Sequence, residues 1–181
     1  MLALVDDVPQ CYVDNDWICA QYWSDYRPEL VDAFVQHLWL TVISVVAGLV
    51  VAVPLALLAR RRGSTESLVV GATTVIYTIP SLALFSLLLP FTGLTPTTVI
   101  IGLALYSLTV LVRNIVAGLQ GVPAPVVEAA RGVGYSRTRL LLRVELPLAL
   151  PVIMAGLRVA TVSTVALVTI GSIVSYGGLG N

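Results

Sequence analysis

Few side chains in this sequence are of a type that could make or break covalent bonds. The 181 residues include no lysine, one histidine, His37, and two cysteines, Cys11 and Cys19. A P-loop needs a lysine at the phosphates, Schiff-base chemistry needs an amine, and a usual zinc site needs four nitrogen or sulfur ligands. The Gly-x-Ser-x-Gly motif of serine hydrolases is absent as well. We therefore expect no catalytic residue, no metal site and no bound cofactor, and a protein that works through its shape and its partners.

The composition is that of an integral membrane protein. Hydrophobic residues make up 57% of the chain and charged residues 11%, and the mean hydropathy is +0.94. So few polar side chains cannot cover the surface of a water-soluble globule. The elements that position any functional residue are therefore expected to be membrane helices in an all-α, polytopic bundle.

The amino-terminal segment differs in charge from the rest of the chain. Residues 1–32 carry seven acidic residues and one arginine, whereas residues 33–181 carry nine arginines and three glutamates. We expect residues 1–35 to form an acidic, aromatic segment ahead of a transmembrane domain at 36–181. Because Trp and Tyr favour the membrane–water boundary, this segment would either lie on the membrane or dock an outside partner. Cys11 and Cys19 would pair only in an oxidising compartment, and the sequence leaves their pairing open.

Four segments are long and apolar enough to cross about 30 Å of hydrocarbon as helices. Pro80 should kink the second of them, because proline removes a backbone hydrogen bond. Arginines follow the first segment at 60–62 and gather between the third and fourth, so both loops are expected in the cytoplasm. The amino terminus and the glycine-rich end would then face outside. The expected spans cover residues 38–59, 68–91, 97–112 and 148–174.

Polar and small residues recur at helical spacing within three of these spans. Such rows either line a polar pathway or pack helices together. Arg158, about ten residues into the last span, would point into the bundle or reach back to the cytoplasmic interface. The rows are Thr73, Tyr77 and Ser81; Gly102, Tyr106, Thr109 and Arg113; and Gly156, Ala160 and Thr164.

The loop at about 118–146 carries the most informative pattern. It is too polar to cross a membrane, and prolines at 123 and 125 favour a short helix over 126–132. Gly134 would supply a break or a C-cap, and residues 135–146 read as a second amphipathic helix that Pro147 stops. Two such helices would form a rigid knob that transmits motion from a soluble partner. The alternative is an interfacial helix whose arginines bind lipid phosphates.

The spacing within this loop resembles a known motif. Glu128-Ala129-Ala130, Gly134 after three residues, and Val144-Glu145-Leu146-Pro147 after nine more resemble the EAA loop of ABC importer permeases, EAA-x3-G-x9-I-x-L-P. Valine stands in place of the motif's isoleucine. More narrowly, residues 77–90, 105–119 and 144–158 resemble permeases for osmoprotectants such as glycine betaine, carnitine and choline.

This resemblance implies a type I ABC importer permease in the bacterial cytoplasmic (inner) membrane, with no chemistry of its own. The loop would couple a separate ATPase dimer, which uses ATP and Mg²⁺, to alternating access. An extracytoplasmic solute-binding protein, a second permease copy or a sibling, and lipids would be its partners, with no nucleic acid. The implied coupling residues are Glu128, Ala129, Ala130, Gly134, Val144, Leu146 and Pro147. The pathway candidates are Tyr77, Pro80, Ser81 and Tyr106, the tyrosines because aromatic faces hold quaternary ammonium groups.

The number of expected spans departs from the usual pattern of this family. Such permeases usually have five spans with the amino terminus outside, so four spans indicate a chain cut before the last one. The alternatives in function are a permease for another small solute, or a membrane anchor that holds a soluble partner and moves nothing.

Overall fold

The computed structural model describes residues 10–14, 18–60 and 63–181, which form helices and turns and contain no strand. The all-α expectation is thereby confirmed. Arg61 and Arg62, on which the predicted orientation partly rests, lie outside the described residues, as do the first nine residues of the acidic segment. The helices are α1 (Gln10–Val13), α2 (Ala20–Asp25), α3 (Arg27–Ala59), α4 (Gly63–Thr78), α5 (Ser81–Thr92), α6 (Pro96–Gln120), α7 (Ala124–Gly132), α8 (Arg137–Leu140), the π-helical turn η1 (Leu141–Glu145), α9 (Leu146–Val168), and the 3₁₀ turns η2 (Thr169–Val174) and η3 (Gly178–Gly180).

Three long stretches of helix in the described chain could each cross a membrane by length and composition: α3, α6 and the continuous run at 137–174. Their apolar runs favour helix because only intrahelical bonds satisfy the backbone in lipid. In its most apolar window α6 is 61% buried, against 33% for α3 and 22% for the last run. The middle helix is therefore α6, and it packs against both α3 and α9.

The second expected span is broken and not merely kinked. Helices α4 and α5 pass the same test only as a pair, and they meet at an angle of 96°. Two effects act at this point: Pro80 cannot donate a backbone N–H, and its ring disfavours helical geometry at Ile79. Helix α4 therefore ends at Thr78, and Pro80 becomes the N-cap of α5. The expectation of a kink at Pro80 is corrected to a full break.

The prediction that Pro147 stops a helix is wrong. Residues 137–174 run as one helix, with Pro147 in the first turn of α9. The five residues before α9 form the π-helical turn η1, in which the N–H of Leu146 bonds to the carbonyl of Leu141. A π turn already interrupts the regular ladder of hydrogen bonds, so it accommodates a residue without an N–H.

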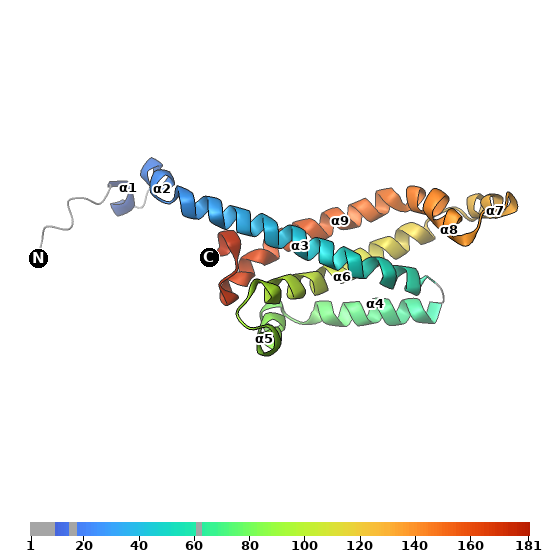
Figure 1. Ribbon diagram of the computed structural model, residues 1–181, viewed down its shortest axis with the longest axis horizontal. Helices are drawn as coiled ribbons and strands as arrows, with labels where there is room; N and C mark the ends of the chain where they lie inside the picture. The colour runs from blue at the N-terminus through green and yellow to red at the C-terminus, as the bar shows by residue number, and fades with distance from the viewer. Residues whose placement is uncertain (1–9, 15–17, 61–62) are drawn as a thin grey trace, which may run out of the picture.

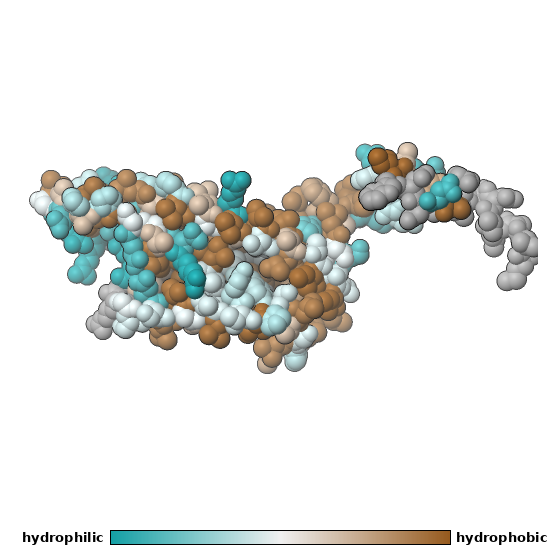
Figure 2. Space-filling model, turned by 180° about the vertical axis from the view of Figure 1, so that it is seen from behind, coloured by the Kyte–Doolittle hydropathy of each residue, from teal (hydrophilic) through white to brown (hydrophobic). Residues whose placement is uncertain are grey.

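The molecule is elongated, and the two arginine-bearing segments lie at the same end (Figure 1). Helices α7 and α8 lie at that end, together with the end of α3 and the start of α4, while α1, α2, α5 and the carboxyl end lie toward the other. On the face in Figure 2, strongly hydrophobic side chains gather over the part of the body away from α7 and α8, and hydrophilic ones are more frequent toward the end of α7 and α8. This separation agrees with the charge pattern of the sequence. Helix α3 runs without a break across the boundary expected between residues 35 and 36.

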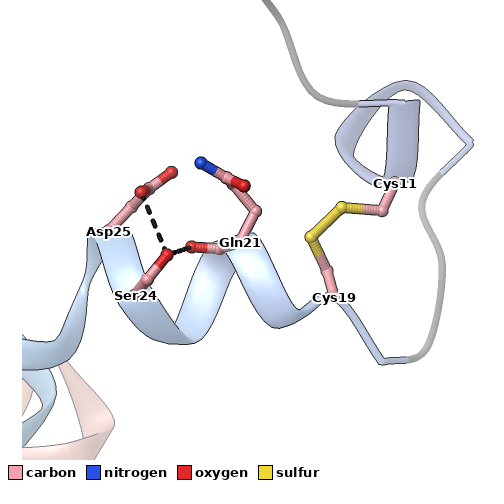
Figure 3. The surroundings of a disulfide bond; sticks show 5 residues. All are labelled: Cys11, Cys19, Gln21, Ser24 and Asp25. Atoms are coloured by element: carbon pink, nitrogen blue, oxygen red, sulfur yellow. Dashed lines mark hydrogen bonds between the residues drawn. A yellow bond between two sulfur atoms is a disulfide. The ribbon is translucent and has the colours of Figure 1, made fainter.

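A disulfide joins Cys11 of α1 to Cys19, the N-cap of α2 (Figure 3). The two Cα atoms are 5.7 Å apart. In the next turn the Ser24 hydroxyl donates to the Gln21 carbonyl at 2.8 Å. The pairing that the sequence left open is thus present, and it ties the amino-terminal segment to the helix that leads into α3.

Candidate functional site

Helix α7 forms the projecting tip of the arginine-rich end (Figure 1). Within the described chain none of its residues is buried; it contacts α8 and η1, and Val127 packs against the edge of the hydrophobic core. Glu128 and Ala129 are exposed, and Ala130 is partly buried. The short helix expected at 126–132 is confirmed, with its start two residues earlier. A small, open surface of this kind lets another protein approach the backbone closely.

Gly134 ends α7 in a Schellman motif. Its φ is +85°, and its N–H bonds to the carbonyl of Arg131 at 3.0 Å. The N–H of Tyr135 bonds to the carbonyl of Ala130 at 3.1 Å, which completes the motif. A Cβ added at Gly134 would meet no atom within 4 Å, so glycine is favoured by the left-handed backbone and not by space. This turn reverses the backbone between α7 and α8 and ends α7 at a fixed point.

The second half of the motif lies apart from this tip. Val144 belongs to η1, and Leu146 and Pro147 open α9. Val144 is partly buried, whereas Leu146 and Pro147 are exposed. The seven residues predicted for coupling therefore fall on two surfaces: one on the projecting helix, and one where the knob passes into the membrane helix.

The three glutamates after residue 33 have different surroundings. Glu66 accepts a hydrogen bond from the Gln120 amide at 2.7 Å, which joins α4 to α6. Glu145 is ion-paired with Arg60. For the side chain of Glu128, the described part of the chain provides no hydrogen bond or ion pair, and it is exposed. Glu128 is therefore available to a basic group of a partner, which would form a charge-assisted bond.

The pathway candidates lie where α6 meets the break between α4 and α5. Tyr77 and Tyr106 contact edge to face, with ring centroids 5.6 Å apart, and the Tyr106 hydroxyl donates to the carbonyl of Ile79. The two polar rows thus face each other. Thr109 donates to the carbonyl of Thr73 at 2.6 Å, and Arg113 donates to the Thr74 hydroxyl at 2.9 Å. These are packing contacts between α4 and α6. Pro80 is exposed and Ser81 half-buried at the break itself.

Of the two roles expected for the small-residue row of α9, the structure shows helix packing, with Gly156 against α6. Gly156, Ala160 and Thr164 are all buried. A Cβ on Gly156 would lie 2.3 Å from Cβ of Asn114, so the two helices touch there. Arg158 was expected either to point into the bundle or to reach back to the interface. Its side chain is exposed on α9, so within the described residues it does not point into the bundle.

Sequence reasoning missed two links between distant segments. Arg60, the C-cap of α3, donates two hydrogen bonds to Glu145. These bonds raise the pKa of the Arg60 guanidinium above its ordinary value, although burial acts to lower it. His37 accepts from the Leu179 N–H at 3.3 Å through Nδ1 and contacts the Val165 carbonyl at 3.0 Å through Nε2. A signal for the first link was present: a glutamate between apolar residues at the edge of a span needs a buried partner.

A bundle of apolar helices with a helical projection at its polar end is the architecture of a polytopic membrane protein. The family described as "Binding-protein-dependent transport system inner membrane component" matches residues 44–181, and the chain belongs to this family. The carnitine transport permease protein OpuCB of Listeria monocytogenes is 37% identical over 146 residues, 81% of this chain and 67% of the relative. The osmoprotectant import permease protein OsmW of Salmonella typhimurium is 37% identical over 164 residues, 88% and 76% of the two chains.

Solved structures confirm the fold. A chain of the MetNI methionine ABC transporter in an inward-facing conformation matches with a TM-score of 0.73 and 25% identity, over 83% of this chain and 76% of that one. A chain of an amino acid ABC transporter crystallised with histidines has the same TM-score at 23% identity, over 90% and 79%. The expected ABC importer permease fold is therefore present.

Proposed function

We propose that this chain is the membrane-spanning permease subunit of an ATP-driven importer of an osmoprotectant quaternary ammonium solute. Two observations support the substrate class: the names of the relatives, which include a choline permease 35% identical over 161 residues, and the tyrosine pair beside the α4–α5 break. A tyrosine ring can attract a quaternary ammonium group, which offers no N–H. Another small solute is the nearest alternative.

The proposed mechanism is alternating access driven by a partner. A separate ATPase dimer would bind ATP and Mg²⁺, close, and move α7 and its counterpart on a second copy or a sibling permease. The bundle would then open outward to a solute-binding protein in the extracytoplasmic space. In this arrangement the arginine-rich end faces the cytoplasm and the disulfide-bonded amino terminus faces outside, in the bacterial inner membrane.

The exposed tip of α7 is the observation that carries the coupling role. Glu128 offers an unpaired carboxylate in the described chain, and the small residues Ala129 and Ala130 allow close seating. Gly134 supports the projection through its left-handed turn. A second candidate function, a membrane anchor for a soluble protein, would use the same tip but would move no solute.

The test is co-purification in mild detergent of the full-length permease with the ATPase encoded beside it. Wild type should retain the ATPase, whereas Glu128→Arg and Gly134→Val should lose it, because one reverses the contact charge and the other strains the turn. Matched controls are Glu29→Arg near the opposite end and Gly71→Val, where an added Cβ meets no atom within 4 Å. If the ATPase never associates, or stays bound equally to both variants, the coupling assignment is wrong.

Uptake of radiolabelled glycine betaine, carnitine and choline into proteoliposomes then separates the two functions. An osmoprotectant permease moves at least one of them only when ATP and the binding protein are present. An anchor retains the ATPase but moves none of them, and neither does a permease for another solute, so that result would contradict the proposed substrate class.

A further inference from the structure

The only ion pair between side chains of the described residues joins Arg60, the C-cap of α3, to Glu145, the last residue of η1. Arg60 Nη1 lies 2.7 Å from Glu145 Oε2, and Nη2 lies 2.8 Å from Oε1. The two residues are 85 positions apart in sequence. Two parallel bonds between a planar guanidinium and a carboxylate hold both the distance and the relative orientation of the groups.

The pair lies where three elements converge. Arg60 directly follows α3, and Glu145 is the last residue of η1, which joins α8 to α9. Helix α7 contacts η1, so a displacement of the tip reaches η1 directly. The main chain connects η1 directly to α9, and the ion pair connects η1 to the end of α3. A π-helical turn is a frequent mark of a functional position within a helix.

Burial makes this link hard to open. The side chain of Glu145 is 6% exposed and that of Arg60 is 28% exposed. A carboxylate removed from water needs its charged partner, because an unpaired buried charge is strongly unfavourable. The pair therefore holds together when η1 moves, so that the ends of α3 and α9 move as one body.

We propose that Arg60 and Glu145 are positioning residues that transmit movement of the knob to α3 as well as to α9. Helices α3 and α9 contact each other directly, and both also pack against α6. Without the pair, this end of α3 has no ionic link to the knob and follows α9 only through packing contacts, because the polar contact of His37 with the Val165 carbonyl lies near the other end of α3. This inference rests on the proposed function, and neither residue belongs to the contact surface assigned above.

The test uses the full complex of permease, ATPase and binding protein in proteoliposomes, and measures radiolabelled glycine betaine moved per ATP hydrolysed. Arg60→Lys keeps the charge but offers a single flexible ammonium in place of the fork. Glu145→Gln keeps the shape and removes the charge. We expect both variants to co-purify with the ATPase and hydrolyse ATP, while the solute moved per ATP falls roughly three- to tenfold. Arg158→Lys, the same substitution at an exposed position of α9, should leave the ratio unchanged.

Two outcomes would overturn the inference. An unchanged ratio in both variants means that the pair only stabilises the fold, and loss of the ATPase means that it supports docking. A wild-type complex that binds the ATPase and hydrolyses ATP but moves no solute contradicts the proposed function itself, which separates that failure from failure of the ion-pair link.

Discussion

The hydroxyl of Tyr106, on the central helix α6, donates a hydrogen bond to the backbone carbonyl of Ile79 in the break between α4 and α5. Carbonyls at the end of a helix lack an intrahelical partner, and leaving one unsatisfied in an apolar environment is costly. The side chain first considered for a pathway therefore satisfies the backbone at the break. Its ring also contacts Tyr77 near the end of α4, so α6 holds the break and the α4 side of the bend.

Replacing Tyr106 with phenylalanine tests this role. The variant keeps the ring but leaves the Ile79 carbonyl without its partner, which should cost about 1–3 kcal/mol of stability. The measurement is thermal unfolding in detergent. Tyr77→Phe is the control, because the Tyr77 side chain is half exposed and its hydroxyl makes no hydrogen bond to the described residues. Equal loss of stability in the two variants would contradict the assignment.

The surroundings of two helical glycines, Gly156 in α9 and Gly71 in α4, predict opposite effects of an added methyl group on stability. At Gly156 an added Cβ would lie 2.3 Å from Asn114, so Gly156→Ala should force the helices apart and cost about 1–3 kcal/mol. At Gly71, in the middle of α4, no atom lies within 4 Å of the added Cβ. Gly71→Ala should therefore gain up to about 1 kcal/mol from helix propensity. Thermal unfolding of both variants in detergent measures these changes in stability. A Gly156→Ala protein as stable as wild type would exclude the close contact between the helices.

The disulfide and the proposed orientation predict a labelling pattern. Cys11 and Cys19 are the only cysteines of the chain. A membrane-impermeant maleimide should label the protein in intact cells only after treatment with reductant, because both cysteines are paired and, in the proposed orientation, would lie outside. Cys11→Ser should be labelled without reductant, through the freed Cys19.

Two results would contradict parts of this pattern. Labelling of the denatured wild-type protein without reductant would show that the cysteines are not paired. Labelling of Cys11→Ser only after the membrane is permeabilised would place the amino terminus in the cytoplasm.

Much of this protein could be predicted from patterns that are local in sequence. Long apolar runs predict membrane helices because lipid offers the backbone no other partner. Arg60 and the arginines at 131–143 were expected on one side, and their segments do lie at one end of the molecule, whereas Arg113, expected in the same loop, lies within α6. The turn at Gly134 was expected because glycine readily adopts a left-handed backbone.

What could not be predicted depends on residues that meet only in three dimensions. Pro80 indicates a disturbed helix, but the 96° bend also depends on Tyr106, which satisfies the Ile79 carbonyl from another helix. Pro147 lies within a continuous helix because the π-helical turn before it absorbs the lost hydrogen bond.

The sequence by itself determined the class of protein, its helices and the place of the knob, because composition, helical period and turn residues act over a few positions. The tertiary structure alone decided which charges are internal. Glu66, Glu128 and Glu145 look alike in the sequence, yet only the fold brings Gln120 to the first and Arg60 to the third. The reason is physical: burial in an apolar bundle makes a partner necessary, and only packing decides which partner lies within reach.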